Sequence, residues 1–158
     1  MKKFSKLIDL PILTEEKSMR LGKISDVLFD TKTLKICALI ISTNSIIPLA
    51  KLIKIDDISK IDESSVWVNN EKVVASAKAM KGIENVASFQ KDIEGTIIIN
   101  NSNRMGTISD IFFNAEIGEI AEFEVSDGFV EDVLSGRKSV AIERSVNFKD
   151  KKIVMNGD

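Results

Sequence analysis

The sequence predicts an all-β protein built from two copies of one small domain, and three observations support this fold class. A nine-residue motif recurs, GKISDVLFD at 22–30 and GTISDIFFN at 106–114, with an offset of 84 positions. Apolar and charged side chains alternate along 119–125, which is the period of a half-buried strand. Short stretches rich in β-branched and aromatic residues are separated by turn-forming residues. A motif repeated in register indicates a duplicated structural unit.

The composition is that of an ordinary globular protein. The chain has 158 residues, of which 44% are hydrophobic and 29% charged, with eight Gly and two Pro. No apolar run approaches the roughly 20 residues of a membrane-spanning helix, and the N-terminal stretch lacks the unbroken apolar core of a signal peptide. The single cysteine, Cys37, excludes an internal disulfide and fits a reducing compartment. We therefore expect a cytoplasmic protein without a transmembrane segment, which leaves association with a membrane surface open.

The repeat also predicts the domain limits. We expect a first domain at 1–75, a connecting segment with a short helical turn at 76–92, and a second domain at 93–158. The tail IPLAKLIKI of the first copy aligns with VAIERSVNF of the second, at an offset nine larger than that of the motif, which predicts an insert in the second copy. Each copy should form five or six short strands. The expected strands span about 9–14, 22–30, 34–42, 46–50, 52–55 and 66–70 in the first copy, and about 94–100, 106–114, 118–126, 139–143, 145–148 and 152–156 in the second.

The repeated motif resembles a known family. G-x-I-S-D-V-x-F-D, followed by a turn, an alternating strand, I-P-L and later V-W-V, is similar to the PRC-barrel, a domain named after the H subunit of the photosynthetic reaction centre. The same domain forms the C-terminal half of a ribosome-maturation factor. The resemblance covers nearly the whole chain, twice, as in tandem PRC-barrel proteins of spore-forming bacteria. It implies a six-stranded β-barrel in each copy, a non-catalytic role and contacts with other proteins, and it implies no catalytic residue and no cofactor.

One strand is apolar on both faces. Domains this small are marginally stable alone, so we expect the two lobes to pack on each other or the chain to dimerise. The side chains expected to point inward are Cys37, Leu39 and Ile41, and those expected to point outward are Ile36, Ala38 and Ile40. The equivalent outward positions of the second copy are Ile120, Glu122 and Glu124. A strand apolar on both faces is usually covered on both, here by the other lobe, the connecting segment, a second copy or a partner protein. We expect Ile40 to be mostly buried and Glu124 to face solvent.

The insert at 126–138 is the least repeat-like part of the chain. We expect an extended hairpin or a turn there, and loops on rigid scaffolds often carry function. Asp127, Glu131 and Asp132 supply oxygen ligands, but their spacing does not match a calcium-binding loop, so we predict no metal site. The insert is our second candidate surface for a partner. Its residues are Phe129, Val130, Val133, Leu134, Arg137 and Lys138.

The remaining motif residues favour structural roles. Each Asp of the repeated Ser-Asp pair, Asp26 and Asp110, should bond to backbone donors in a nearby turn, because the adjoining serine points to the opposite face. Gly22 and Gly106 should occupy a turn or bulge with positive φ. Trp67 has two interpretations, an exposed recognition anchor or a position in the barrel or lobe interface. The Cys37 thiol should be inert.

The functional expectation is a non-enzymatic protein–protein interaction module, an adaptor of the bacterial cytoplasm, with a second copy of the chain among its partners. The chain has no His and no Tyr, which removes the commonest general base and zinc ligand. The alternative is a ribosome-assembly or RNA-associated factor that acts through a ribosomal protein. A net charge of −2 argues against direct binding of nucleic acid. Residues 1–79 are net basic and 80–158 net acidic, a weak attraction between lobes because salt screens it.

Overall fold

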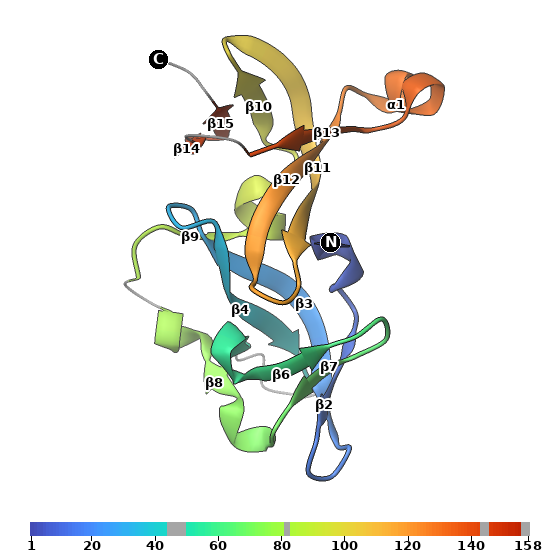
Figure 1. Cartoon of the computed structure of the whole chain (residues 1–158). Coiled ribbons are helices and arrows are strands. Elements are labelled where there is room, and N and C mark those ends of the chain that lie inside the picture. The colour runs from blue at the N-terminus through green and yellow to red at the C-terminus, as the bar shows by residue number, and fades with distance from the viewer. Residues whose placement is uncertain (44–49, 81–82, 143–145, 156–158) are drawn as a thin grey trace.

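The structure, a computed structural model, describes residues 1–43, 50–80, 83–142 and 146–155. It is all-β, with two lobes stacked along one long axis, which confirms the predicted fold class and tandem packing (Figure 1). The first lobe consists of β2 (Pro11–Thr14), β3 (Arg20–Asp30), β4 (Lys35–Ser42), β5 (Lys51–Lys54), β6 (Ile58–Ile61) and β7 (Val66–Val68). The second consists of β10 (Ile97–Asn100), β11 (Asn103–Asn114), β12 (Glu119–Ser126), β13 (Lys138–Ala141), β14 (Val146–Lys149) and β15 (Lys152–Met155).

Both lobes have the same topology within the described residues. The strand orders are β6-β7-β2-β3-β4-β5 and β14-β15-β10-β11-β12-β13. All neighbours are antiparallel except β2–β7 and β10–β15, which are parallel. The short elements are β1 (Lys2–Lys3), β8 (Ala75–Ser76), β9 (Val86–Ser88), the 3₁₀ turns η1 (Phe4–Lys6), η2 (Ile55–Asp57), η3 (Glu71–Val73) and η4 (Ala77–Met80), the π-helical turn η5 (Phe89–Ile93) and α1 (Phe129–Ser135).

The predicted alignment of the two tails is wrong. Ile53 of β5 pairs with Leu39, as Val140 of β13 pairs with Phe123, so the tails are offset by 87 positions, three more than the motif. The alignment failed because both tails alternate apolar and polar residues, so a shifted register looks equally good. Strand β6 was not predicted, and the strand expected at 46–50 lies outside the described residues except for Ala50.

A β-bulge interrupts the alternation in the third strand of each lobe. Phe29 pairs with Ile36, but Leu28 pairs with Ala38, so Cys37 is an extra residue with no partner in this ladder. Because of this extra residue, the Ile36 side chain points into the main core. The expectation that Ile36 points outward is therefore wrong.

The second lobe repeats this device. Phe113 pairs with Ile120 and Phe112 with Glu122, which leaves Ala121 as the extra residue. Ile120 accordingly belongs to the core and is 4% exposed. Because both bulges lie at equivalent positions, the pairs Leu28/Phe112 and Phe29/Phe113 are equivalent, as the repeat predicted.

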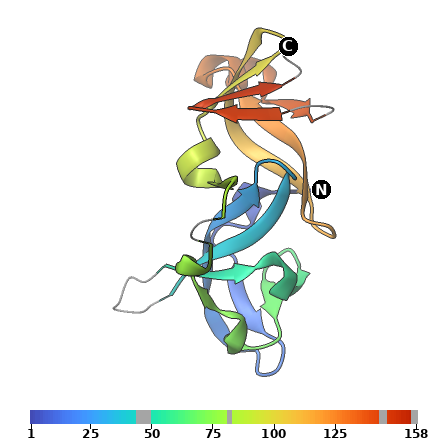
Figure 2. The same ribbon diagram turned by 90° about the vertical axis from the view of Figure 1, so that its left-hand side faces the viewer.

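The two repeats exchange their first segments, which we call the first leader (1–10) and the second leader (86–95). In the first leader, β1 pairs with β11 of the second lobe. In the second leader, β9 pairs with β3 of the first lobe. The leaders lie on opposite sides of the waist between the lobes (Figure 2). The exchange gives the waist an approximate twofold symmetry.

Four phenylalanine rings form the centre of this waist. The Phe4 ring centroid lies 5.4 Å from Phe113, 5.5 Å from Phe89 and 6.0 Å from Phe29, all in edge-to-face arrangements. Each of the four residues is at most 2% exposed. Such ring pairs contribute about 0.5–1.5 kcal/mol beyond the burial of their area. The two leaders, β3 of the first lobe and β11 of the second lobe therefore contribute to one shared core.

The first motif carboxylate holds the second leader in place. Asp26 Oδ1 accepts hydrogen bonds from its neighbour Val27 N at 2.7 Å and from Gln90 N at 3.2 Å. Asp26 Oδ2 accepts a hydrogen bond from Ser88 Oγ. Asp26 is 7% exposed, so its desolvation is offset by these donors.

The second motif carboxylate does the same for the first leader. Asp110 Oδ1 accepts from Ile111 N at 2.8 Å and from Ser5 N at 3.1 Å, and Oδ2 accepts from Ser5 Oγ. Bonding of both aspartates to backbone donors is confirmed. The predicted location of these donors was wrong. Gln90 N and Ser5 N lie in the leader of the opposite repeat and not in a nearby turn.

The motif glycines allow neighbouring strands to approach closely. Gly22 has φ +156°, and a Cβ there would lie 2.4 Å from Ser42 O; Gly106 has φ +129°, with 2.4 Å to Ser126 O. Both lie beside a register shift in the ladder with the preceding strand, which confirms the predicted bulge with positive φ.

We predict that Phe4→Ala lowers the free energy of unfolding by about 3–5 kcal/mol, because it removes a fully buried ring from the waist. Urea denaturation followed by circular dichroism measures this. The control is Met19→Ala, at a side chain 40% exposed, which should stay within about 0.5 kcal/mol of wild type. Equal losses for both variants would mean that the four rings do not stabilise the waist.

Candidate functional site

The outer face of β4, the first predicted partner surface, is largely covered. Ala38 is fully buried and Ile40 is half-buried. Ile40 pairs across the ladder with Leu52, which is also fully buried, and Leu52 pairs in turn with Ala75 of β8. Of the three residues assigned to this patch, Ile36, Ala38 and Ile40, only Ile40 retains partial exposure.

The insert forms a short helix, α1, and not the expected extended hairpin or turn. Gly128 and Gly136 flank the helix with φ +124° and +75°, values that favour glycine, and Glu131 and Asp132 lie in its first turn, where a helix dipole favours negative charge. Alternation-based reasoning missed this helix because it is only two turns long. Its Phe129 and Val130 side chains lie outside the described part of the structure.

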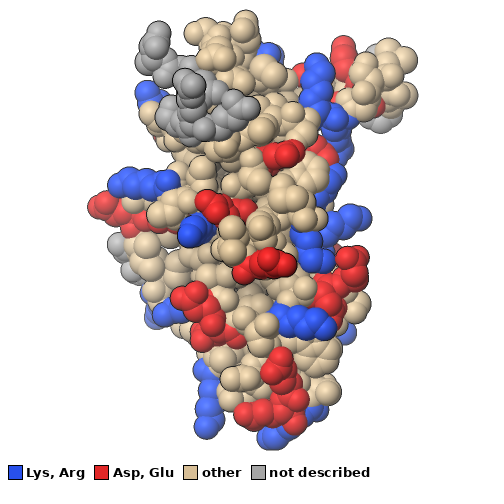
Figure 3. Space-filling view, viewed as in Figure 1, with Lys and Arg blue, Asp and Glu red and all other residues tan. Residues whose placement is uncertain are grey.

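Helix α1 projects from the second lobe and exposes aliphatic side chains. Val133 is 69% exposed and Leu134 is 79% exposed, and among the large hydrophobic residues of the described chain only Met1 matches the exposure of Val133. Figures 1 and 3 show the helix standing off the body of the molecule, with mostly uncharged atoms at its tip. We call the surface formed by Val133, Leu134, Arg137, Lys138 and Ser139 the α1–β13 surface.

A buried carboxylate braces the base of this surface. Glu124 is 7% exposed and forms an ion pair with Lys3 Nζ of the first leader. Its Oε1 accepts hydrogen bonds from Arg137 Nη1 at 3.1 Å and from Ser109 Oγ at 3.1 Å. The expectation that Glu124 faces solvent is wrong, because the first leader and Arg137 cover it from both sides.

Further charged pairs fix the helix to the strands. Asp132 of α1 accepts a hydrogen bond from Ser126 Oγ at 2.6 Å and lies 3.4 Å from Arg137 Nε. Lys138 Nζ lies 2.6 Å from Asp127 Oδ2. Two of the three carboxylates considered as cation ligands, Asp127 and Asp132, are thus engaged in ion pairs. Among the described residues, no cluster of three or more His, Cys, Asp or Glu side chains is arranged to hold a metal ion.

The ionisation of Glu124 reflects its partners. Burial by itself would raise the pKa of this carboxyl, but the hydrogen bonds from Lys3 and Arg137 outweigh burial and lower the pKa below 4.5. Glu124 is therefore charged at neutral pH. It links three segments, because Lys3, Ser109 and Arg137 come from the first leader, β11 and the end of the insert.

The remaining candidates for chemistry have structural surroundings. Burial, together with the nearby Asp30 charge, raises the pKa of the half-buried Cys37 thiol to about 11, so the thiolate is scarce at neutral pH. Trp67 is half-buried on β7, and its Nε1 donates to Asp62 Oδ2 at 2.9 Å. No helix among the described residues is long and apolar enough to cross a bilayer.

The repeated topology and motif are matched by comparison with known proteins. The family model of the PRC-barrel domain matches residues 1–72 and again 86–158, so the chain belongs to the PRC-barrel family, in a tandem arrangement. A curated relative is the uncharacterized protein YrrD of Bacillus subtilis (strain 168). It is 26% identical over 151 residues, which cover 93% of this chain and 83% of the relative.

We predict that Glu124→Gln lowers the free energy of unfolding by about 1–2 kcal/mol, because it removes the charge that Lys3 and Arg137 share. Glu119→Gln is the matched control, at the exposed start of the same strand, and should change stability by less than about 0.5 kcal/mol. Urea denaturation at pH 7 compares the two. Similar small losses in both variants would show that the network adds nothing to stability.

The difference in unfolding free energy between wild type and Glu124→Gln should depend on pH. The pKa of Glu124 is lower in the folded chain, so its contribution is present above the unfolded value of 4.5 and is lost as pH falls through the lower folded value. We expect the difference between wild type and Glu124→Gln to be full at pH 7 and to shrink as the pH falls below 4.5. Denaturation curves across this range measure it, and a difference that grew on acidification would contradict the assignment.

Proposed function

We propose that this protein is a non-enzymatic protein-binding module that acts as an adaptor in the bacterial cytoplasm and contacts its partner through the α1–β13 surface. The observation that carries the proposal is the exposure of Val133 and Leu134 on a helix that ion pairs hold firmly in place. Burying one aliphatic side chain of this size stabilises a complex by about 1.5–3 kcal/mol. An aliphatic pair on a braced helix can therefore form the centre of an interface.

An unpaired strand edge next to the helix supports the same proposal. In the first lobe, β8 pairs with the outer edge of β5, at Lys51 and Leu52. The equivalent residues of β13 are Lys138 and Ser139, and in the described part of the chain β13 pairs only with β12. Such an edge offers backbone donors and acceptors to an extended segment of another protein.

The chemistry of the motif residues supports a role without catalysis. Both motif aspartates are saturated by donors from the leaders. The high pKa of Cys37 keeps its thiol protonated. Family membership points the same way, since the PRC-barrel resemblance implies contacts with proteins and supplies no catalytic residue.

The test is an affinity capture from native lysate with the double variant Val133→Asp, Leu134→Asp. Wild type should retain a partner that the variant loses, because two charges would have to be buried at the contact. Ile83→Asp is the control, at an aliphatic residue 49% exposed elsewhere on the chain, and should retain the partner.

RNase-treated and untreated arms separate the two classes of function. An adaptor should retain its partner in both arms. Loss of all captured material after RNase treatment would contradict the proposal and favour an RNA-associated factor. Capture of a basic ribosomal protein in both arms would keep the proposal and place the adaptor in ribosome assembly.

A further inference from the structure

The exchange of leaders creates two equivalent grooves, one on each side of the waist. The first groove lies between the first leader and the β6–β7 hairpin and has a volume of about 330 Å³. The second lies between the second leader and the β14–β15 hairpin, with Thr31 at one end, and has a volume of about 590 Å³. Because the two lobes share one topology, the charges of the first groove can be compared directly with those of the second.

Two of the three lysines in the first groove are paired with acidic residues of the chain. Its leader carries Lys2, Lys3 and Lys6, and its hairpin carries Asp62 and Glu63. Glu63 Oε1 lies 3.4 Å from Lys2 Nζ, so hairpin and leader are joined by an ion pair. Lys3 forms its ion pair with Glu124.

The second groove has the opposite charge on its hairpin. Lys149, Lys151 and Lys152 of the hairpin line it, together with Lys91 of η5. None of these four lysines forms an ion pair within the described part of the chain, which distinguishes them from Lys2 and Lys3 of the first groove.

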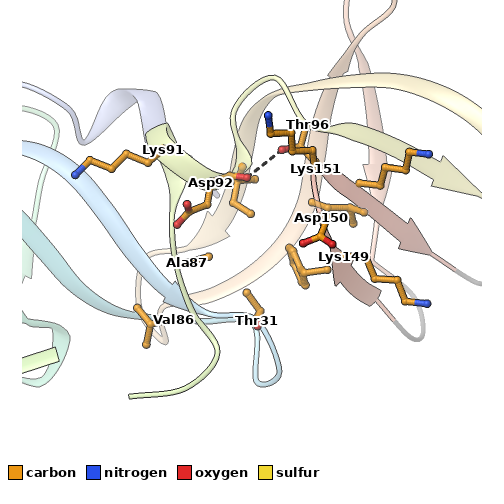
Figure 4. Close-up of a pocket in the computed structure, with 13 residues that line it drawn as sticks. Thr31, Val86, Ala87, Lys91, Asp92, Thr96, Lys149, Asp150 and Lys151 are labelled. Atoms are coloured by element: carbon orange, nitrogen blue, oxygen red, sulfur yellow. Dashed lines mark hydrogen bonds between the residues drawn. The ribbon is translucent and has the colours of Figure 1, made fainter. Parts of the chain in front are cut away.

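The acidic residues of the second groove do not compensate for these lysines. Asp92 and Asp150 line it, so cations outnumber anions. The Asp92 carboxylate already accepts a hydrogen bond from Ser88 N at 2.8 Å, and Thr96 Oγ1 donates to the backbone oxygen of Asp92 at 3.0 Å (Figure 4). The Asp92 carboxylate therefore bonds back to the residue before η5, and no hairpin lysine of the described chain reaches it as an ion-pair partner.

We propose that the second groove binds an acidic, extended segment of a partner protein. The carboxylates of that segment take the place that Glu63 has in the first groove, and the flexible lysine side chains of the hairpin close on them. The wall at Val86 and Ala87 belongs to β9, which pairs only with β3 among the described strands and so offers backbone groups to an extended peptide. Ile93 and Ile153 supply an apolar floor.

A protein fits this groove better than a nucleic acid. The whole chain carries a net charge of −2, so it repels a polyanion at long range, and binding of nucleic acid is driven by neutralising many phosphates. A short acidic peptide needs only the local surplus of lysines. The inference rests on the proposed function in that the occupant is a protein, but the groove is separate from the α1–β13 surface, so each can fail alone.

The test is a titration of the full-length, ¹⁵N-labelled chain, followed by backbone amide shifts. The probe is a ten-residue peptide that alternates Glu and Val between terminal glycines, and the matched probe has Gln in place of every Glu. We expect the Glu peptide to shift the amides of Lys91, Thr96 and Lys151. Its affinity should fall roughly tenfold between about 50 and 300 mM salt, because the contact is electrostatic.

Variants locate the contact. Lys149→Glu combined with Lys151→Glu should weaken binding of the Glu peptide at least about tenfold. Lys17→Glu, an exposed lysine on the β2–β3 turn, changes the charge in the same direction and should weaken binding less than about twofold. Unchanged amide positions in the rest of the spectrum show that each variant is folded.

Three outcomes would overturn the inference. These are the absence of shifts at millimolar peptide, equal binding of the Gln peptide, and shifts confined to the α1–β13 surface. A 20-nucleotide RNA that bound the same amides more tightly than the Glu peptide would also overturn it and assign the groove to nucleic acid. The affinity capture with α1 variants is unaffected by any of these results, so the two proposals are separable.

Discussion

Each lobe of this protein takes part of its core from the other, because the two repeats exchange their leaders across the waist. Asp26 and Asp110 are buried carboxylates whose donors lie on the opposite leader, and Phe4 fills the space between rings of both lobes. A buried carboxylate without its donors would carry a large desolvation penalty. Neither lobe therefore has a complete core alone, and the two should unfold together.

The exchange of leaders gives both lobes the same backbone arrangement, but equivalent positions in the two lobes have different surroundings. Ile40 and Glu124 occupy equivalent positions, yet one packs beside the buried Leu52 and the other joins the first leader to Arg137. The difference follows from the neighbours, because β8 covers the edge of β5 whereas the insert carries Arg137 to the base of β12. The same backbone thus supports an apolar contact in one lobe and a charge network in the other.

Both proposed contact regions lie where the approximate symmetry is broken. Helix α1 and the unpaired edge of β13 have no counterpart among the described residues of the first lobe, whose equivalent edge is covered by β8. The hairpin lysines of the second groove replace the acids Asp62 and Glu63 of the first. Under both proposals, the first copy is closed on itself and the second copy carries the contact regions.

The amino-acid sequence by itself determined the duplication, the all-β class, the second-lobe strands and the bulge glycines, because these depend on local pattern and on conformations that only certain residues adopt. Three features were decided by tertiary structure. The bulges at Cys37 and Ala121 reverse the direction of the side chains that precede them, the leaders cross to the opposite lobe, and Glu124 is buried beneath Lys3. Each depends on a contact between segments far apart in the chain, and a period of two carries no information about which distant segment a strand will meet.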